Sequence, residues 1–304
     1  MRRRSLTAIA LAAVCALAAC ATNEPGRDSA LGDRAVTVAS FDFPESVLLA
    51  ELYGRALEAK GIDVRYRLDL GPRELVEPAL EAGLVELVPE YAGTAVEFLS
   101  LGRETPRRNL AATRAALSRT LAGKPVVALA SAPAANANAV VVTRARADRD
   151  GLRTISDLAP GARRLTFGGP PGCEARPFCL RGLTGTYGLR FAGFLPLDVG
   201  GPLTHQALTG GHVDVGLLFT TDPAIARDGL VVLRDDKGLQ PAENVTPVVR
   251  REVVDRWGDR LTAAVDAVSA HLTTATLGQL NGRVAAGESP AVVATNWLRA
   301  EGLT

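Results

Sequence analysis

Two apolar, strand-like segments that each end in a short polar and aromatic loop constrain the fold of this chain most. Residues 36–46 have the sequence Val-Thr-Val-Ala-Ser-Phe-Asp-Phe-Pro-Glu-Ser, and residues 85–95 have the sequence Val-Glu-Leu-Val-Pro-Glu-Tyr-Ala-Gly-Thr-Ala. A helical pattern follows each loop. In an open α/β sheet, loops at the carboxyl ends of the strands are where ligands bind. The second loop places the aromatic face of Tyr91 beside Gly93 and the hydroxyl of Thr94, which favours a cation or a small polar solute over covalent chemistry.

The N-terminus has the pattern of a bacterial lipoprotein signal peptide. Three arginines precede an apolar run that is too short to span a bilayer, and this run ends in Leu-Ala-Ala before Cys20. The ending resembles the lipobox, whose cysteine is acylated and becomes the mature N-terminus. We expect a signal peptide at residues 1–20, a flexible tether at 21–34 and a lipid on Cys20 that anchors the protein to the extracytoplasmic face of the cell membrane. An ordinary secretory signal is the alternative, and export by the Sec or the twin-arginine route stays open.

The rest of the chain, roughly 270 residues, exceeds one ordinary hydrophobic core and fits two lobes. Strand and helix patterns alternate along it, and the chain enters a second lobe near Ala135 and returns near Asn244. We therefore expect an α/β protein with a discontinuous first lobe, residues 35–135 and 245–304, and a second lobe, residues 136–244. The expected strands are 35–39, 63–70, 84–89, 126–129, 139–143, 164–167, 213–219, 230–233 and 244–250, and the expected helices are 46–60, 73–82, 111–121, 155–158, 205–209 and the region after 252.

Two cysteines lie close together in the second expected lobe. Cys173 and Cys179 are separated by five residues within a segment rich in proline and glycine. In an exported protein such a pair favours a local disulfide, which would add about 2–3 kcal/mol in the chain-entropy model and hold the loop in place. Zinc is the competing interpretation, but two thiols without a nearby histidine make half a site.

Several segments, in the same order along the chain, resemble one family of binding proteins. The two loops described first are similar to G-S-K-N-F-T-E-Q and D-[IL]-Y-P-E-Y-T-G-T. Residues 213–222, 230–237 and 247–252 are similar to V-D-V-x-x-A-Y-S-T-D, L-V-V-L-E-D-D-K and P-L-V-R-K-E. These are motifs of the osmoprotectant-binding (glycine betaine, choline, carnitine) substrate-binding proteins of ABC importers. The resemblance covers almost all of the chain after the tether.

The resemblance implies a two-lobed periplasmic-binding-protein-like (type II) fold and a non-catalytic function. A small compatible solute, such as glycine betaine, choline or a similar quaternary ammonium compound, would be captured between the lobes by closure about the two crossover segments. The closed, monomeric protein would then dock on a cognate ABC permease. A binding protein for a different polar solute and a non-catalytic lipoprotein adaptor are the alternatives.

The resemblance also indicates which residues contact the solute. A quaternary ammonium group cannot donate hydrogen bonds, so proteins hold it against aromatic faces by cation–π attraction. Tyr91 matches the family's cage tyrosine, Phe219 replaces another tyrosine, and Phe43 matches the phenylalanine of N-F-T-E. The candidate ligand-binding residues are Ser40, Phe41, Asp42, Phe43, Arg73, Tyr91, Thr94, Asn138, His205, Phe219 and Thr220.

Three candidates depart from the family pattern. Asn138 replaces a tyrosine at the crossover between the lobes, Arg73 belongs to a Pro-Arg pair where glycine and threonine are usual, and His205 takes a position where tyrosine is common. We expect a ligand cage with fewer aromatic and more polar groups than in the relatives, and this composition leaves the identity of the solute open.

Composition and motifs exclude several other functions. A net charge of +1 gives no electrostatic case for nucleic-acid binding. The sequence has no G-x-S-x-G elbow, P-loop or H-E-x-x-H motif, and it points to no cofactor or metal. Glu45 and Glu90 could form a pair of catalytic carboxylates. Both match glutamates of the non-catalytic family, so helix capping or ordering of the lobes is the favoured role.

Overall fold

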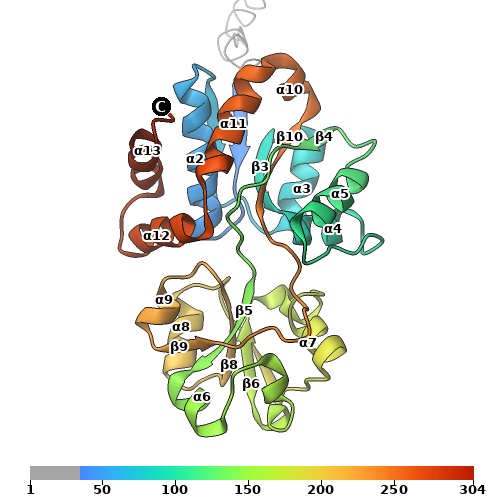
Figure 1. The fold of residues 1–304 in the computed structure, drawn as a ribbon, viewed down its shortest axis with the longest axis vertical. Coiled ribbons are helices and arrows are strands. Elements are labelled where there is room, and N and C mark those ends of the chain that lie inside the picture. The colour runs from blue at the N-terminus through green and yellow to red at the C-terminus, as the bar shows by residue number, and fades with distance from the viewer. Residues whose placement is uncertain (1–34) are drawn as a thin grey trace, which may run out of the picture. The chain divides into compact units, whose positions relative to one another are not determined.

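The computed structural model describes residues 35–304. The predicted signal peptide, the tether and the lipidation of Cys20 lie outside these residues. Within 35–304, no helix combines the length and the apolar character needed to cross a membrane. Two five-stranded sheets with helices on their faces make up residues 36–304 (Figure 1).

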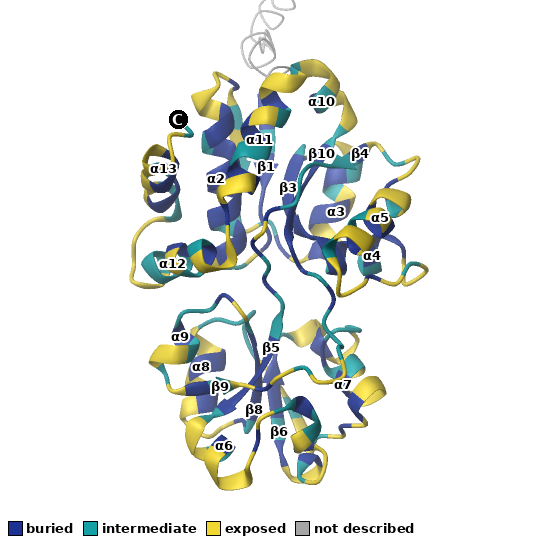
Figure 2. Ribbon diagram, in the orientation of Figure 1, coloured by how far each residue is buried: buried dark blue, intermediate teal, exposed yellow. Residues whose placement is uncertain are grey.

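The first sheet has the strand order β2-β1-β3-β10-β4. Strand β1 is parallel to β2 and β3, whereas β10 is antiparallel to β3 and β4. Helices cover both faces of this sheet, and each interface is a separate apolar core (Figure 2). The strands are β1 (Val36–Ala39), β2 (Val64–Arg67), β3 (Leu87–Tyr91), β4 (Val126–Ala128) and β10 (Val245–Arg250), and the helices are α2 (Pro44–Ala59), α3 (Arg73–Ala82), α4 (Ala92–Leu99), α5 (Leu110–Thr120), α10 (Arg251–Trp257), α11 (Asp259–His271), α12 (Thr274–Ala285) and α13 (Pro290–Ala300).

The second sheet has the order β7-β6-β8-β5-β9, with β6 parallel to its neighbours and β5 antiparallel to β8 and β9. Its cores lie on either side of the central strands. The elements are β5 (Asn138–Thr143), β6 (Thr166–Gly169), β7 (Gly193–Pro196), β8 (Val215–Phe219), β9 (Leu230–Val232), α6 (Arg144–Asp150), α7 (Leu180–Tyr187), α8 (Pro202–Thr209) and α9 (Ala224–Arg227), with short 3-10 helices at Ile155–Leu158, Ala162–Arg164 and Pro171–Glu174.

Two chain segments connect the sheets, because β10 returns to the first sheet after the second is complete. The segments pair with each other through an isolated bridge between Ala135 and Asn244. The Asn244 amide also donates to the carbonyl oxygens of Ala132 and Pro133. This arrangement confirms the predicted two-lobed α/β fold with a discontinuous first lobe.

Local sequence did not reveal every element. Helix α7 was not predicted, since Gly182 and Gly185 each weaken a helix by about 1 kcal/mol relative to alanine. Tertiary packing requires one of them: a Cβ on Gly182 would lie 1.8 Å from the carbonyl oxygen of Pro177. The loop that creates this contact is closed by a disulfide between Cys173 and Cys179, as the spacing of the cysteines predicts.

Candidate functional site

A cavity of about 480 Å³ lies between the two lobes. Its walls come from the start of α2, the first crossover segment, α8 with its preceding loop, the loop after β8 and helix α12. The loops after β1 and β8 lie at the carboxyl ends of their strands, where open α/β sheets bind ligands. The volume falls within the roughly 300–1,000 Å³ that is typical of small-molecule pockets. This cavity is therefore the candidate functional site.

Phe43 is at the centre of an aromatic group in this cavity. Its ring centroid lies 5.7 Å from that of Phe219, in the other lobe, and 6.1 Å from those of Phe41 and Tyr91. Phe43 and Phe219 line the cavity, whereas Phe41 and Tyr91 are buried residues of the first lobe. The Arg73 guanidinium already lies against the Phe41 ring, 4.8 Å from its centroid. Phe43 and Phe219 are thus the rings available for cation–π contact in the cavity.

The carboxylate of Glu45 accepts four hydrogen bonds. Pro44 occupies the first position of α2, which proline favours, and this places Glu45 in the first turn beside the cavity. Its Oε1 accepts from the Tyr91 hydroxyl and the Asn136 amide, each at 2.6 Å, and its Oε2 accepts from the Thr221 hydroxyl and the Asn281 amide. An ionised carboxylate has about four acceptor positions, and all are filled here. Glu45 is a negative charge whose four partners are all neutral.

His205 lies between two carboxylates on the second-lobe side of the cavity. Its Nε2 is 2.7 Å from Asp222 and its Nδ1 is 2.9 Å from Asp228. Burial alone lowers the pKa of His205, but the two carboxylates outweigh burial, so the net pKa is raised above its ordinary value. Arg227 pairs with the same Asp228 at 2.8 Å. With His205 protonated, the two negative and two positive charges of this group compensate each other.

A second group of carboxylates lies around Arg73 of the first lobe. Glu90, at the end of β3, is fully buried and accepts two hydrogen bonds from Arg73, at 2.6 and 2.8 Å. Burial and the nearby Glu90 raise the pKa of Glu77 well above its ordinary value. Burial also raises the pKa of Glu243 to about 7, although hydrogen bonds from Thr94 oppose this rise. Arg73 is therefore engaged by Glu90 and Phe41.

Comparison with known proteins identifies the family. A family model described as the substrate-binding domain of ABC-type glycine betaine transport systems matches residues 34–300. The chain belongs to this family. It is 30% identical to the glycine-betaine-binding protein of Pseudomonas aeruginosa over 84% of this chain and 85% of that protein. It is 24% identical to an ergothioneine transport permease/ergothioneine binding protein of Helicobacter pylori, over 90% of this chain and 49% of that protein.

A solved structure shares the fold. A crystal structure described as a glycine betaine/carnitine/choline ABC transporter superposes with a TM-score of 0.71 at 26% identity, covering 88% of this chain and 99% of the other. The predicted resemblance is confirmed. As a substrate-binding protein of a glycine betaine/choline-type ABC transporter, the protein is non-catalytic, and it belongs to an extracytoplasmic family whose members bind small solutes and deliver them to a permease.

The predicted ligand-binding residues of this family member fall into two groups. Phe43, His205 and Phe219 line the cavity. The others are not part of its lining, and their contact with a solute stays a prediction. Ser40 accepts from the backbone of Asp69, Asp42 is exposed, Asn138 donates to the Phe178 carbonyl, Thr220 accepts from the backbone of Ala137, and Phe41, Arg73, Tyr91 and Thr94 form the contacts given above.

Four residues of the cavity lining are not among the ligand contacts that the sequence predicts. They are Glu45, Asn136, Thr221 and Asn281. Glu45 itself was assigned to helix capping or ordering of the lobes, and its bond to Thr221 does connect the lobes. Asn136 lies two residues before Asn138 in an extended segment, where alternate side chains point to the same side. The prediction for Asn138 could therefore have included Asn136. Asn281 lies in helix α12, 236 residues from Glu45, and no local motif marks it.

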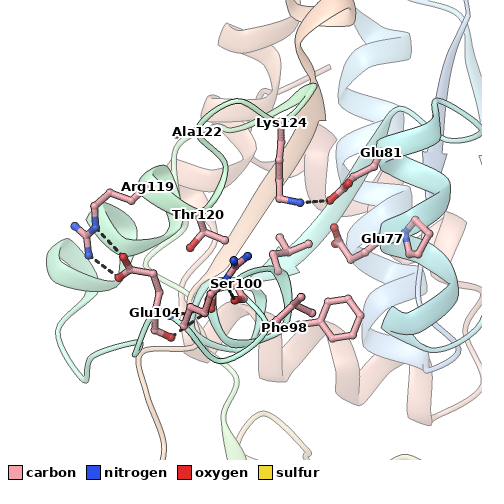
Figure 3. A pocket seen from close by; sticks show the side chains of 13 residues that line it. Glu77, Glu81, Phe98, Ser100, Glu104, Arg119, Thr120, Ala122 and Lys124 are labelled. Carbon is pink, nitrogen blue, oxygen red and sulfur yellow. Dashed lines mark hydrogen bonds and ion pairs between the residues drawn. The ribbon is translucent and has the colours of Figure 1, made fainter.

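Another cavity, of about 600 Å³, lies entirely within the first lobe (Figure 3). It is formed by α3, the end of α4 with its following loop, and the end of α5. Opposite charges in its wall are paired, between Arg119 and Glu104 and between Lys124 and Glu81. Phe98 is the aromatic residue of its lining. Although larger, this cavity lies away from the loops after β1 and β8, so it is a weaker candidate for the solute site.

Proposed function

We propose that this protein captures a quaternary ammonium solute between its two lobes and presents it to its permease as a monomer anchored through a lipid on Cys20. The observation that supports this proposal is the pair of aromatic rings from different lobes, Phe43 and Phe219, which line one cavity. A trimethylammonium group needs aromatic faces rather than hydrogen-bond acceptors. The name of the Pseudomonas aeruginosa relative supports the same class of solute.

Capture follows from the placement of the cavity between the lobes. A solute that touches Phe43 and Phe219 together contacts both lobes, so its binding energy favours the closed arrangement over an open one. The hinge motion would take place in the paired crossover segments that include Ala135 and Asn244. The Asn136, Thr221 and Glu45 contacts lie at the same closure surface, so they would form and break with it.

A different polar solute is the second candidate. The observation in its favour is the polar, hydrogen-bonded His205 and Asp222 pair in the cavity wall, where a purely aromatic cage would have another ring.

The test is a thermal-shift screen of the purified, detergent-solubilised protein against glycine betaine, choline, carnitine, ergothioneine and proline. A solute that binds the folded state raises the melting temperature in proportion to the logarithm of its concentration. We expect stabilisation by at least one trimethylammonium compound and none by proline. Stabilisation by none of the trimethylammonium compounds at millimolar concentration would contradict the proposal.

Anchoring has a separate test. Cys20→Ser should move the protein from the membrane fraction into the soluble fraction, and globomycin-type inhibition of lipoprotein processing should leave an unprocessed precursor. Retention of the Cys20→Ser protein in carbonate-washed membranes would contradict the lipid anchor.

A further inference from the structure

Glu45 provides charge without a free hydrogen-bond acceptor. Four donors fill the acceptor positions of its carboxylate. A primary ammonium solute would lose hydrogen bonds to water and recover none from Glu45, and unsatisfied buried donors are costly. A quaternary ammonium group has no N–H to satisfy, so it gains the attraction of the carboxylate without this cost. The saturated carboxylate therefore discriminates by the number of N–H groups on the solute.

The charges lining the cavity leave Glu45 uncompensated. Asp222 and Asp228 face His205, whose pKa they raise, and Arg227 pairs with Asp228. The remaining charged group in the lining is Glu45. The cavity thus has a net negative charge, which favours a solute of net positive charge over a zwitterion.

The groups that would receive a solute carboxylate already hold carboxylates of the protein. Helix α8 starts at the cavity wall, and a helix N-terminus is an anion site when its N–H groups are free. Here the N–H groups of Gly201, Leu203 and Thr204 all donate to Asp198, and Pro202 has none. Asp198 therefore neutralises this helix end.

Carboxylates of the protein also occupy the other groups near the cavity that could bind an anion. The first turn of α4 donates to Glu243 through Thr94, and the Arg73 guanidinium is held by Glu90. At the start of α2, Pro44 lacks an N–H and the Glu45 carboxylate repels a second anion.

We infer, on the basis of the proposed function, that the cavity selects a quaternary ammonium cation that carries no carboxylate, that is, a solute of choline type. Glu45 supplies the countercharge, and Asp198 closes the anion site at the start of α8. Glycine betaine has the same trimethylammonium group with a carboxylate, and ethanolamine has the hydroxyl of choline with a primary ammonium group. These three compounds separate the two parts of the inference.

Isothermal titration calorimetry of the full-length protein in detergent tests the inference. Choline should bind more tightly than glycine betaine by on the order of tenfold, and more tightly than ethanolamine by on the order of a hundredfold. Equal or tighter binding of glycine betaine would overturn the inference while the proposed function stands. Binding of neither trimethylammonium compound would instead contradict the proposed function.

Substitution of Asp198 tests the closed anion site. Asp198→Ala frees the N–H groups of the α8 first turn, so the ratio of choline to glycine betaine affinity should fall by on the order of fivefold or more. Asp157→Ala is the matched control, because Asp157 caps a 3-10 helix of the same lobe through the N–H groups of Arg153 and Thr154 and does not line the cavity. An unchanged ratio in Asp198→Ala, with the fold intact by circular dichroism, would overturn this part.

Two substitutions test Glu45 through affinity ratios that a purely structural role would not move. Glu45→Gln should weaken choline binding several-fold more than glycine betaine binding. If this variant does not fold, Thr221→Val provides the measurement, because it keeps the charge and frees one acceptor position. Ethanolamine should then gain at least severalfold relative to choline. An unchanged choline to ethanolamine ratio in a folded Thr221→Val protein would overturn the role of the saturated carboxylate.

Discussion

Glu45 begins helix α2 just after β1, and Glu90 lies at the end of β3, yet the surroundings of these two glutamates of the first lobe give them opposite roles. Glu90 is enclosed with a bidentate arginine partner, and its charge is compensated inside the protein. Glu45 has four neutral partners and faces the cavity. The comparison shows that burial of a carboxylate does not decide whether it can act on a ligand. What decides it is whether its partners carry the opposite charge.

The largest effect should come from removing the partner of the enclosed carboxylate. Arg73→Ala leaves the Glu90 charge buried and unpaired, so unfolding free energy should fall by about 3–5 kcal/mol. Arg119→Ala is the control, because its pair with Glu104 is exposed and should contribute less than about 1 kcal/mol. Urea denaturation measures both. Similar losses in the two variants would show that burial does not raise the contribution of the Arg73–Glu90 pair to stability.

The enclosed group should also make stability depend on pH. Burial raises the pKa of Glu243 to about 7 in the folded protein, above the ordinary value of 4.5 that applies to the unfolded chain. The folded state then binds more protons, so the free energy of unfolding falls as the pH rises from about 4.5 to about 7 and levels off above this. The decrease that comes from Glu243 should be on the order of 3 kcal/mol.

Glu243→Gln isolates this contribution. Glu77, whose pKa is also raised, and His205, whose charged form is stabilised in the folded state, add slopes of the same sign. In Glu243→Gln the free energy of unfolding should therefore still fall as the pH rises, but by less than in the wild-type protein. A wild-type and variant pair with identical pH profiles between pH 4.5 and 8 would exclude Glu243 as a titrating group.

The surroundings of Glu45 and Glu90 also differ in their aromatic rings. Phe219→Ala removes a ring that lines the cavity, and it should weaken the binding of a trimethylammonium solute by about 1–2 kcal/mol, roughly five- to thirtyfold. Phe41→Leu changes a ring whose face is held by Arg73, so binding should change by less than about twofold. Calorimetric titration distinguishes them. A larger loss in Phe41→Leu would mean that the solute lies deeper in the first lobe.

The smallest effect concerns one of the four donors to Glu45. Tyr91→Phe keeps the ring next to Phe43 and removes the buried hydrogen bond to Glu45. Tyr53→Phe is the control, because it removes a buried hydrogen bond to Ser269 away from the cavity. Each should lower stability by about 1 kcal/mol. Tyr91→Phe alone should also alter solute affinity, by a few-fold. Equal affinity of the two variants for choline would show that the Tyr91 hydrogen bond to Glu45 does not contribute to solute binding.

The sequence predicted the fold well because its signals are local and repeated. Alternating strand and helix patterns, together with motifs in a fixed order, determined a two-lobed α/β protein with a discontinuous first lobe. Loop chemistry at the strand ends also predicted Phe43 and Phe219 as ligand-binding residues, and both line the cavity between the lobes. The spacing of Cys173 and Cys179 was sufficient for the disulfide.

The partners of each buried charge were decided by tertiary structure. Glu45 and Glu90 look alike in sequence, since each is a glutamate near the end of an apolar, strand-like segment. Glu90 finds its arginine 17 residues away, whereas the donors to Glu45 lie between 46 and 236 residues away in the chain. Hydrogen bonds act over about 3 Å, so their effect on a carboxylate depends on which distant segments folding brings into contact. No local pattern encodes that set, and it determines which of the two glutamates faces a ligand as an uncompensated charge.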